Sequence, residues 1–283
     1  MSMSTTRPLP TWNVHVIEFA RSKDQLVAGL VHDAYDEGRV DVPFSFVLAR
    51  HGAHVALIDT GFMKEGSGQA MSEKFGVPFW ISPLRMLDEL GVAPDAVTDI
   101  VLSHAHFDHM GSIHQFPHAR IHIQKRELLS WIEALAMPRQ FGYLTEIINP
   151  DDLRNAFDAS LEHRLNLVDG DLDNLLPGLH LRLGEGHTVG QQFVVLETER
   201  GRLVISGDCV YSQRNICGHN HDGVYVPLAN ATGSVWDQLR TFDRINKEIE
   251  GDLSRLVILH DMQRWSHLPV EMEVDGFRIA RAS

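Results

Sequence analysis

Residues 102–112 read LSHAHFDHMGS and hold four potential metal ligands within six positions: His104, His106, Asp108 and His109. Imidazole nitrogens and carboxylate oxygens are ligands that zinc and other first-row divalent metals accept in proteins. The apolar letters IVL end one residue short of the first histidine, which indicates a short buried strand followed by a loop. Side chains alternate in direction along such a segment, so its ligands can serve two adjacent metals. A solvated polar loop is the alternative interpretation of this segment.

Three later residues extend the pattern, because each also follows an apolar run or lies between glycines. His187 lies in GEGHTVGQQ, where glycines allow the backbone to approach other segments closely. Asp208 ends the run RLVISGD, and His260 ends the run LVILH. A lone histidine is more often a structural group than a ligand. Three such residues in chain order after the first cluster nevertheless predict one shared metal site.

The elements that must position these ligands are strands that end at them and helices between the strands. Residues 12–21 and 44–62 read as strands, the second range folding back through RHGAH as a hairpin. SPLRMLDELGV predicts a helix with Ser82 as its cap, and RELLSWIEALA predicts another that Pro138 ends. No internal repeat or flexible linker interrupts the chain. We expect a single domain over residues 1–283, with a helical insertion at about residues 124–165.

Composition limits the classes of partner and compartment. The 283 residues include 38 acidic and 25 basic ones, a formal net charge of -13, and no run rich in lysine or arginine. Binding to nucleic acid would therefore work against the field of the protein. No apolar stretch approaches the ~20 residues of a membrane span, and the first residues lack the apolar run of a signal peptide. Because the chain has only two cysteines, Cys209 and Cys217, we expect a cytoplasmic protein without disulfides. We expect its partner to be a small-molecule substrate. A homodimer is one assembly that the sequence allows.

In their order and spacing these ligands resemble those of the metallo-β-lactamase superfamily, and the LIDTG segment that contains Asp59 adds to the resemblance. The resemblance implies an α+β fold, the αββα sandwich, with a dinuclear site at one edge. It assigns His104, His106 and His187 to the first metal and Asp108, His109 and His260 to the second. Asp208 bridges the two, and Asp59 supports ligands without binding metal. Zinc is favoured for such a nitrogen-rich set, although iron, cobalt and manganese accept the same ligands.

Within the superfamily, several branches fit poorly. The commonest class B β-lactamases carry cysteine at the position of Asp208 and are exported. Glyoxalase II adds a carboxy-terminal helical domain, for which we expect no room in the 23 residues after His260. Flavodiiron proteins carry glutamate at the position of His106 and a flavin domain, and the superfamily nucleases usually carry an additional RNA-binding region.

The sequence is most similar to the branch of N-acyl homoserine lactonases and 4-pyridoxolactonase. Phe107 within the histidine motif, the long segment between His109 and His187, and Tyr211 three residues after Asp208 carry this resemblance. It implies that the Tyr211 hydroxyl faces the substrate carbonyl; the alternative is an aromatic side chain of the pocket wall.

Two features depart from that pattern. Gln191 stands where many members have a second histidine, and residues 215–233 do not align with the pattern of the branch. His219 and His221, within that stretch, are candidates for the substrate site, with a solvated loop as the alternative.

The resemblance implies a reaction in which a hydroxide shared by two metals attacks the carbonyl of a lactone. Tyr211 and one metal would stabilise the oxyanion, and Asp108 would deliver a proton to the leaving group. An esterase, thioesterase or cyclic-amide hydrolase with the same site is an alternative, as is a mononuclear iron dioxygenase. The aromatic-rich segments are expected to supply part of an apolar pocket wall, from Phe79, Trp80, Met86, Trp131, Met137, Phe141 and Tyr143.

Overall fold

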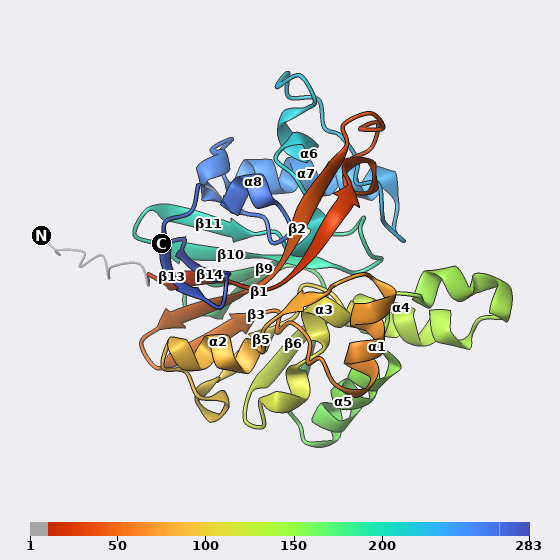
Figure 1. The fold of residues 1–283 in the computed structure, drawn as a ribbon. Helices are drawn as coiled ribbons and strands as arrows, with labels where there is room; N and C mark the ends of the chain where they lie inside the picture. The colour runs from red at the N-terminus through yellow and green to blue at the C-terminus, as the bar shows by residue number, and fades with distance from the viewer. Residues whose placement is uncertain (1–10, 266) are drawn as a thin grey trace, which may run out of the picture.

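Two β-sheets packed face to face form the centre of the molecule, with helices on both outer sides (Figure 1). The structure is a computed structural model and describes residues 11–265 and 267–283. The first ten residues lie outside the described residues. They include most of the segment whose sequence lacks the apolar run of a signal peptide.

The first sheet is mixed and has nine strands, in the order β13-β14-β1-β2-β3-β5-β6-β7, with β4 paired to β1. Strands β3, β5, β6 and β7 run parallel to one another, and the remaining pairs are antiparallel. Its strands are β1 (Asn13–Leu26), β2 (Arg39–His51), β3 (His54–Ile58), β4 (Phe79–Trp80), β5 (Asp99–Val101), β6 (Arg120–Gln124), β7 (Leu165–Val168), β13 (Val270–Val274) and β14 (Phe277–Arg281).

The second sheet has five strands in the order β12-β11-β10-β9-β8, and only β11 and β12 pair in parallel. Its strands are β8 (Leu172–Leu176), β9 (Leu179–Leu183), β10 (Gln192–Thr198), β11 (Gly201–Ile205) and β12 (Leu256–Val257). The α-helices are α1 (Gly66–Lys74), α2 (Pro83–Glu89), α3 (Phe107–Met110), α4 (Lys125–Ala136), α5 (Pro150–Leu161), α6 (Arg214–Cys217), α7 (Val235–Glu248) and α8 (Met262–Trp265).

Three apolar clusters show why these elements form four layers. Successive side chains of a strand point to opposite faces, and here both faces are covered. In β10, Val194 and Leu196 pack between the two sheets, whereas Phe193 and Val195 pack outward against α7. In β1, Val16 lies between the sheets and Ile17 faces the layer of α2, α4 and α5. The αββα arrangement expected from the resemblance is therefore confirmed.

Several expected elements are confirmed, with differences at their ends. The hairpin through residues 50–54 joins β2 and β3, and α4 spans nearly the predicted range. Ser82 is the N-cap residue of α2, but its side chain makes no capping hydrogen bond. After α4 the chain forms the 3-10 helix η4 (Arg139–Thr145), and Figure 1 shows this part extending away from the sheets. Among the described residues, no helix combines the length and the apolar character needed to cross a bilayer.

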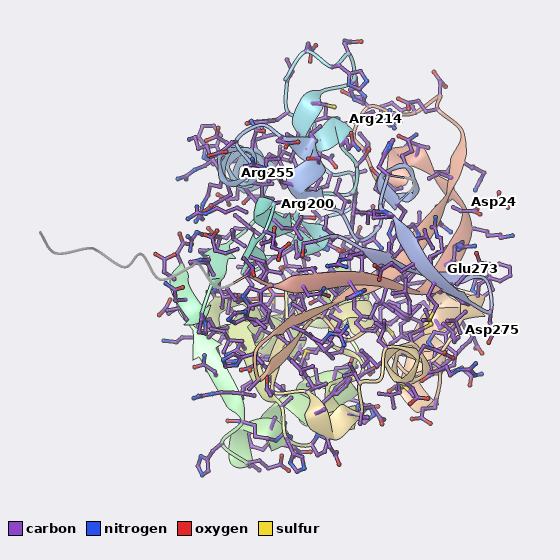
Figure 2. All side chains as sticks on the ribbon, turned by 90° about the vertical axis from the view of Figure 1, so that its left-hand side faces the viewer. Asp24, Arg200, Arg214, Arg255, Glu273 and Asp275 are labelled. Atoms are coloured by element: carbon purple, nitrogen blue, oxygen red, sulfur yellow. The ribbon has the colours of Figure 1, made fainter. Side chains whose placement is uncertain are left out.

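The far end of the β1–β2 hairpin packs against the segment that follows Asp208. Val31 and Ala34 form a small apolar cluster with Val226. The guanidinium of Arg214 on α6, labelled in Figure 2, pairs with the carboxylate of Glu37 from the hairpin. Two segments that are distant in the sequence therefore meet beside the predicted site.

Candidate metal centre

The seven predicted ligands meet at one edge of the sandwich, where strands of both sheets end. His104 and His106 follow β5, and Asp108 and His109 belong to α3. The other three lie in the β9–β10 connection, in the 3-10 helix η5 (Gly207–Cys209) after β11, and after β12: His187, Asp208 and His260. All seven are buried. The loops that follow the strand ends can present these side chains from a rigid scaffold, because the path of a loop does not disturb the hydrogen bonds of the sheet.

The first group of potential ligand atoms comes from His104, His106, His187 and Asp208, and these atoms all lie within 4.8 Å of one another. Nε2 of His187 lies 3.2 Å from Nδ1 of His106 and 3.4 Å from Oδ2 of Asp208. Nε2 of His104 lies 3.8 Å from the same oxygen. The imidazoles of His104 and His187 therefore face the same oxygen of Asp208, and the imidazole of His106 lies beside that of His187.

The second group consists of Asp108, His109 and His260. Nε2 of His109 and Nε2 of His260 are 3.4 Å apart, and each lies 3.1 Å from Oδ1 of Asp208. Oδ2 of Asp108 lies 3.3 Å from the first of these nitrogens and 3.6 Å from the second. The two oxygens of Asp208 thus face different groups, which is the arrangement a bridging carboxylate requires.

This set of atoms fits two divalent cations. Nε2 of His104 is buried and has no hydrogen-bond partner among the described residues. Two pairs of imidazole nitrogens approach to 3.2 and 3.4 Å, a spacing that needs a shared positive charge or a proton between them. Five imidazoles and two carboxylates supply the nitrogen and oxygen ligands that zinc and related metals prefer.

Burial and neighbouring charges shift the pKa values of these groups in opposite directions. Burial, with the adjacent imidazoles, holds the pKa of His104 and His106 well below the usual value, so both imidazoles are neutral. Burial alone would lower the pKa of His109 as well, but the carboxylates of Asp208, Asp108 and Asp59 raise it well above that value. The metal-free site thus holds a proton where a cation would compete for the same nitrogen.

Asp59 holds two of the ligand segments in place, as the resemblance implied. Its carboxylate accepts hydrogen bonds from the backbone N–H of Ser103 at 2.7 Å and from the Ser103 hydroxyl at 2.8 Å. The same carboxylate lies 2.8 Å from Nδ1 of His109. Asp59 adopts a φ of 63°, in the left-handed region that is strained for a residue with a side chain. Such a carboxylate fixes the orientation and basicity of a ligating imidazole.

Two backbone carbonyls and one amide complete the support, and no residue type in the sequence indicates the carbonyls. Nδ1 of His260 lies 2.7 Å from the carbonyl oxygen of Pro43, and Nδ1 of His187 lies 3.2 Å from that of Asn230. Gln191, noted as a departure from the family pattern, is fully buried. With its amide oxygen turned toward them, it accepts hydrogen bonds from the backbone N–H groups of Asp208 at 2.8 Å and Cys209 at 2.7 Å.

Tyr211 lies directly over the metal-binding groups. Its hydroxyl donates to Oδ2 of Asp208 at 3.0 Å, and its ring contacts the rings of His187 and His260 at centroid distances of 5.5 and 5.6 Å. Burial and the charge of Asp208 raise the pKa of this phenol well above its usual value. Tyr211 therefore remains a hydrogen-bond donor at neutral pH.

Two pockets open beside the metal-binding groups, and they share Phe75, Ile147 and Tyr211. The pocket of about 140 Å³ is mainly apolar and reaches Asp108, Asp208 and His260. The pocket of about 250 Å³ reaches His106 and His187. Together they leave the candidate ligands accessible to a small molecule.

Only part of the named apolar set lies at the site, as expected. Of the aromatic and methionine side chains named from the sequence, Tyr143 lines the larger pocket and Trp131 packs against His106 at 5.7 Å between ring centroids. Met86 is fully buried in the core below the first sheet, and the others do not line either pocket. The apolar wall comes instead from side chains on β2 and on segments near α1 and α3: Val42, Phe44, Phe75 and Phe107.

His219 and His221 lie on the loop after α6 and line neither pocket. Nε2 of His219 lies 3.0 Å from the carbonyl oxygen of His32, on the hairpin. Nδ1 of His221 lies 3.5 Å from the sulfur of Cys217. His221 is exposed and His219 is half-buried, so the alternative of a solvated loop describes both residues better than a place in the substrate site.

Comparisons with known proteins agree with this geometry. Residues 38–249 match the model of the metallo-beta-lactamase superfamily. An N-acyl homoserine lactonase of Bacillus thuringiensis is 31% identical over 133 residues, 47% of this chain and 46% of that protein, so the match spans about half the length of this relative. The N-acyl homoserine lactonase AiiB of Agrobacterium fabrum is 27% identical over 256 residues, 84% of this chain and 86% of that protein.

A solved structure has a similar fold. It is that of AidC, a dizinc quorum-quenching lactonase in complex with a product, with a TM-score of 0.66 at 20% identity over 96% of this chain and 94% of that one. The family model covers most of the chain and includes six of the seven ligands, and the seventh, His260, completes the second group. This chain belongs to the metallo-β-lactamase superfamily.

Proposed function

We propose that this protein is a metal-dependent hydrolase that opens the ring of a lactone, either an N-acyl homoserine lactone or another small lactone. The observation that carries the proposal is the position of Asp208, whose two oxygens face two separate groups of buried ligands beside Tyr211 and a pocket. The names of the relatives from Bacillus and Agrobacterium support the choice of a lactone among carbonyl substrates.

His104, His106 and His187 would hold the first ion, Asp108, His109 and His260 the second, and Asp208 would contact both. We propose zinc for both positions, in line with the nitrogen-rich ligands and with the dizinc lactonase of similar fold. Iron, cobalt and manganese accept the same ligands. When bound, such ions lower the pKa of water and polarise a carbonyl oxygen.

Tyr211 is the residue that we assign to the substrate carbonyl. Its neutral hydroxyl lies at the junction of the two pockets, where it can leave Asp208 and donate to a carbonyl oxygen that gains negative charge. Asp108 lines the apolar pocket, so its carboxylate can take the proton that the attacking water releases and pass it to the leaving ring oxygen. Both residues are therefore proposed as catalytic.

The two pockets suit the two ends of such a substrate. Phe44, Phe75 and Phe107 offer apolar surface to an acyl or alkyl group. The larger pocket adds polar groups from Glu146, Asn230 and Thr232. We further propose that the whole chain acts as a single domain, in which the helical segment at about 124–165 contributes Ile147 and Tyr143 to these walls.

Metal analysis combined with a substrate panel tests this function. The purified protein, supplied with zinc, should hold two ions per chain and hydrolyse lactones faster than matched esters, thioesters and cyclic amides. Asp208→Ala should lose metal and activity together, because its carboxylate faces both groups. Full activity with one ion per chain would contradict the dinuclear site. Preference for an open-chain ester or an amide over every lactone would contradict the substrate class, and oxygen consumption with iron alone would favour the dioxygenase.

A further inference from the structure

Glu127 is a fully buried carboxylate that the reaction proposed above does not use. It is the third residue of α4, directly beyond the end of β6, and its exposed fraction is 0%. A buried carboxylate is strongly destabilising unless hydrogen-bond donors surround it. The origin of its donors therefore shows what Glu127 holds together.

Four donors surround this carboxylate, and three of them belong to the ligand loops. Oε1 accepts from the backbone N–H of Ala105 at 3.0 Å and from Nε1 of Trp131 at 2.7 Å. Oε2 accepts from the hydroxyl of Thr188 at 2.7 Å and from the backbone N–H of Gly190 at 3.0 Å. Ala105 lies between His104 and His106, and Thr188 follows His187 directly.

The loop that contains His187 is built to approach Glu127 closely. A Cβ atom on Gly190 would lie 2.3 Å from the backbone nitrogen of Glu127 and 2.7 Å from its Cα atom, closer than such contacts occur. Only glycine therefore fits where the loop meets the start of α4. Trp131, on the next turn of the helix, adds a ring contact with His106.

The second group of ligands has different supports. His109 is oriented by Asp59, and His260 by the carbonyl oxygen of Pro43. None of the hydrogen bonds to Glu127 comes from the residues next to these two histidines. Glu127 thus joins the two loops that supply the imidazoles of the first group and makes no such contact with the second.

We propose that Glu127 is a positioning residue for one of the two metals: it ties the 104–106 loop to the 187–190 loop so that the three imidazoles of the first group are held at one point. This inference rests on the proposed dinuclear centre and adds to it a specific dependence of one ion on a residue that binds neither ion.

Glu127→Gln tests the inference with little change in shape. An amide replaces one oxygen by an NH2 group, and in either orientation that group meets two donors, so two hydrogen bonds are lost. Supports of this kind typically change metal affinity by about 10–100-fold. We expect one of two ions to bind that much more weakly and the other to bind as in the wild type. Glu133→Gln, on the exposed side of the same helix, is the matched control and should bind both ions normally.

The measurement is a titration of the metal-free protein with Co²⁺, followed by its visible absorption, and with Zn²⁺ against a competing chelator. The Co²⁺ spectrum of Glu127→Gln should resemble that of His187→Ala, which lacks a ligand of the first group, and differ from that of His260→Ala. Thermal melting of the metal-free variants establishes that they fold. If Glu127→Gln does not fold, Thr188→Val, which removes one donor to the carboxylate, should weaken the same ion selectively.

The outcomes separate this inference from the proposed function. A wild-type protein that binds two ions, together with folded variants that bind both equally well, would overturn the role of Glu127 alone. Equal weakening of both ions would also overturn it, because the hydrogen bonds reach only one group. A wild-type protein that binds no metal would overturn the dinuclear centre itself.

Discussion

Asp208 is the residue at which the two halves of the site meet. Burial would raise the pKa of its carboxyl, but the charges of His109 and His260 hold it well below the usual range. The group is therefore a carboxylate at every physiological pH, ready to bind cations. The Tyr211 hydroxyl satisfies one of its oxygens, so a single short segment supplies both a metal ligand and a hydrogen-bond donor.

Tyr211→Phe tests the electrophilic role of this hydroxyl. The substitution keeps the ring that packs against His187 and His260 but removes one donor that matters most in the transition state. We expect kcat on the best lactone to fall by about 10 to 10³-fold, in line with the loss of one oxyanion donor partly replaced by a metal. Metal content, measured by elemental analysis, should not change. A variant that raises KM alone would return the hydroxyl to a binding role felt equally in ground and transition states.

At the scale of elements, the site depends on where strands and helices end. β5, β11 and β12 deliver ligands at their carboxyl ends, and α4 delivers Glu127 in its first turn. The first turn of α5 holds another buried carboxyl, Asp152, away from the ligands. Its Oδ1 accepts a hydrogen bond from the side chain of Asn149 at 3.0 Å, while its Oδ2 has no partner among the described residues. Burial, with the charge of Asp151, raises the pKa of Asp152 to about 8.

This shift predicts how Asp152→Asn changes stability with pH. The usual pKa of this carboxyl is 3.8, so between pH 4 and 8 the folded protein retains a proton that the unfolded chain has released. The contribution of Asp152 to the free energy of unfolding of the wild type should therefore fall through this window as pH rises. Asparagine cannot ionise, so the stability of the variant relative to the wild type should rise by up to ~1.4 kcal/mol per pH unit.

Urea unfolding at pH 5, 6.5 and 8 measures this difference. Asp158→Asn, an exposed position on the same helix, is the control and should give a pH-independent difference. A constant difference between Asp152→Asn and the wild type across the three pH values would show that Asp152 ionises normally in the folded protein.

At the scale of the whole molecule, the ligands link the two sheets. His104 and His106 follow a strand of the nine-stranded sheet, whereas Asp208 and His260 follow strands of the five-stranded sheet. Side chains such as Val101 and Ile205 fill the space between the sheets just below the site. An ion bound at this edge therefore joins both layers of the sandwich.

Metal removal should for this reason lower the melting temperature of the entire fold. An ion that binds only the folded protein stabilises it by about 2.7 kcal/mol when free metal is 100 times the dissociation constant. For a chain of this size, that corresponds to a melting temperature higher by about 5 °C or more. Calorimetry before and after chelation, and again after zinc is restored, measures the change. Asp208→Ala should show little response to zinc, and an unchanged wild-type transition would mean that no metal bridges the sheets.

Local patterns in the sequence were sufficient to predict the main elements of the fold and the candidate ligands. Apolar runs that stop at His104, Asp208 and His260 predicted strand ends correctly, because burial of a strand and exposure of the following loop are local properties of the chain. The helix-forming residues at 126–136, followed by Pro138, likewise predicted α4. The types and order of the seven candidate ligands were sufficient to predict the family and the αββα fold, both now confirmed.

Only the tertiary structure decided how those ligands are arranged and supported. Which oxygen of Asp208 faces which group depends on the packing of two sheets, and the role of Glu127 depends on loops 22 and 61–63 residues away in the sequence. The carbonyl of Pro43, which orients His260 across 217 positions, has no signal in residue type because every residue has a carbonyl. Only the tertiary structure likewise decided which of the aromatic side chains reach the pocket, since an aromatic side chain suits a core and a pocket equally until long-range contacts place it.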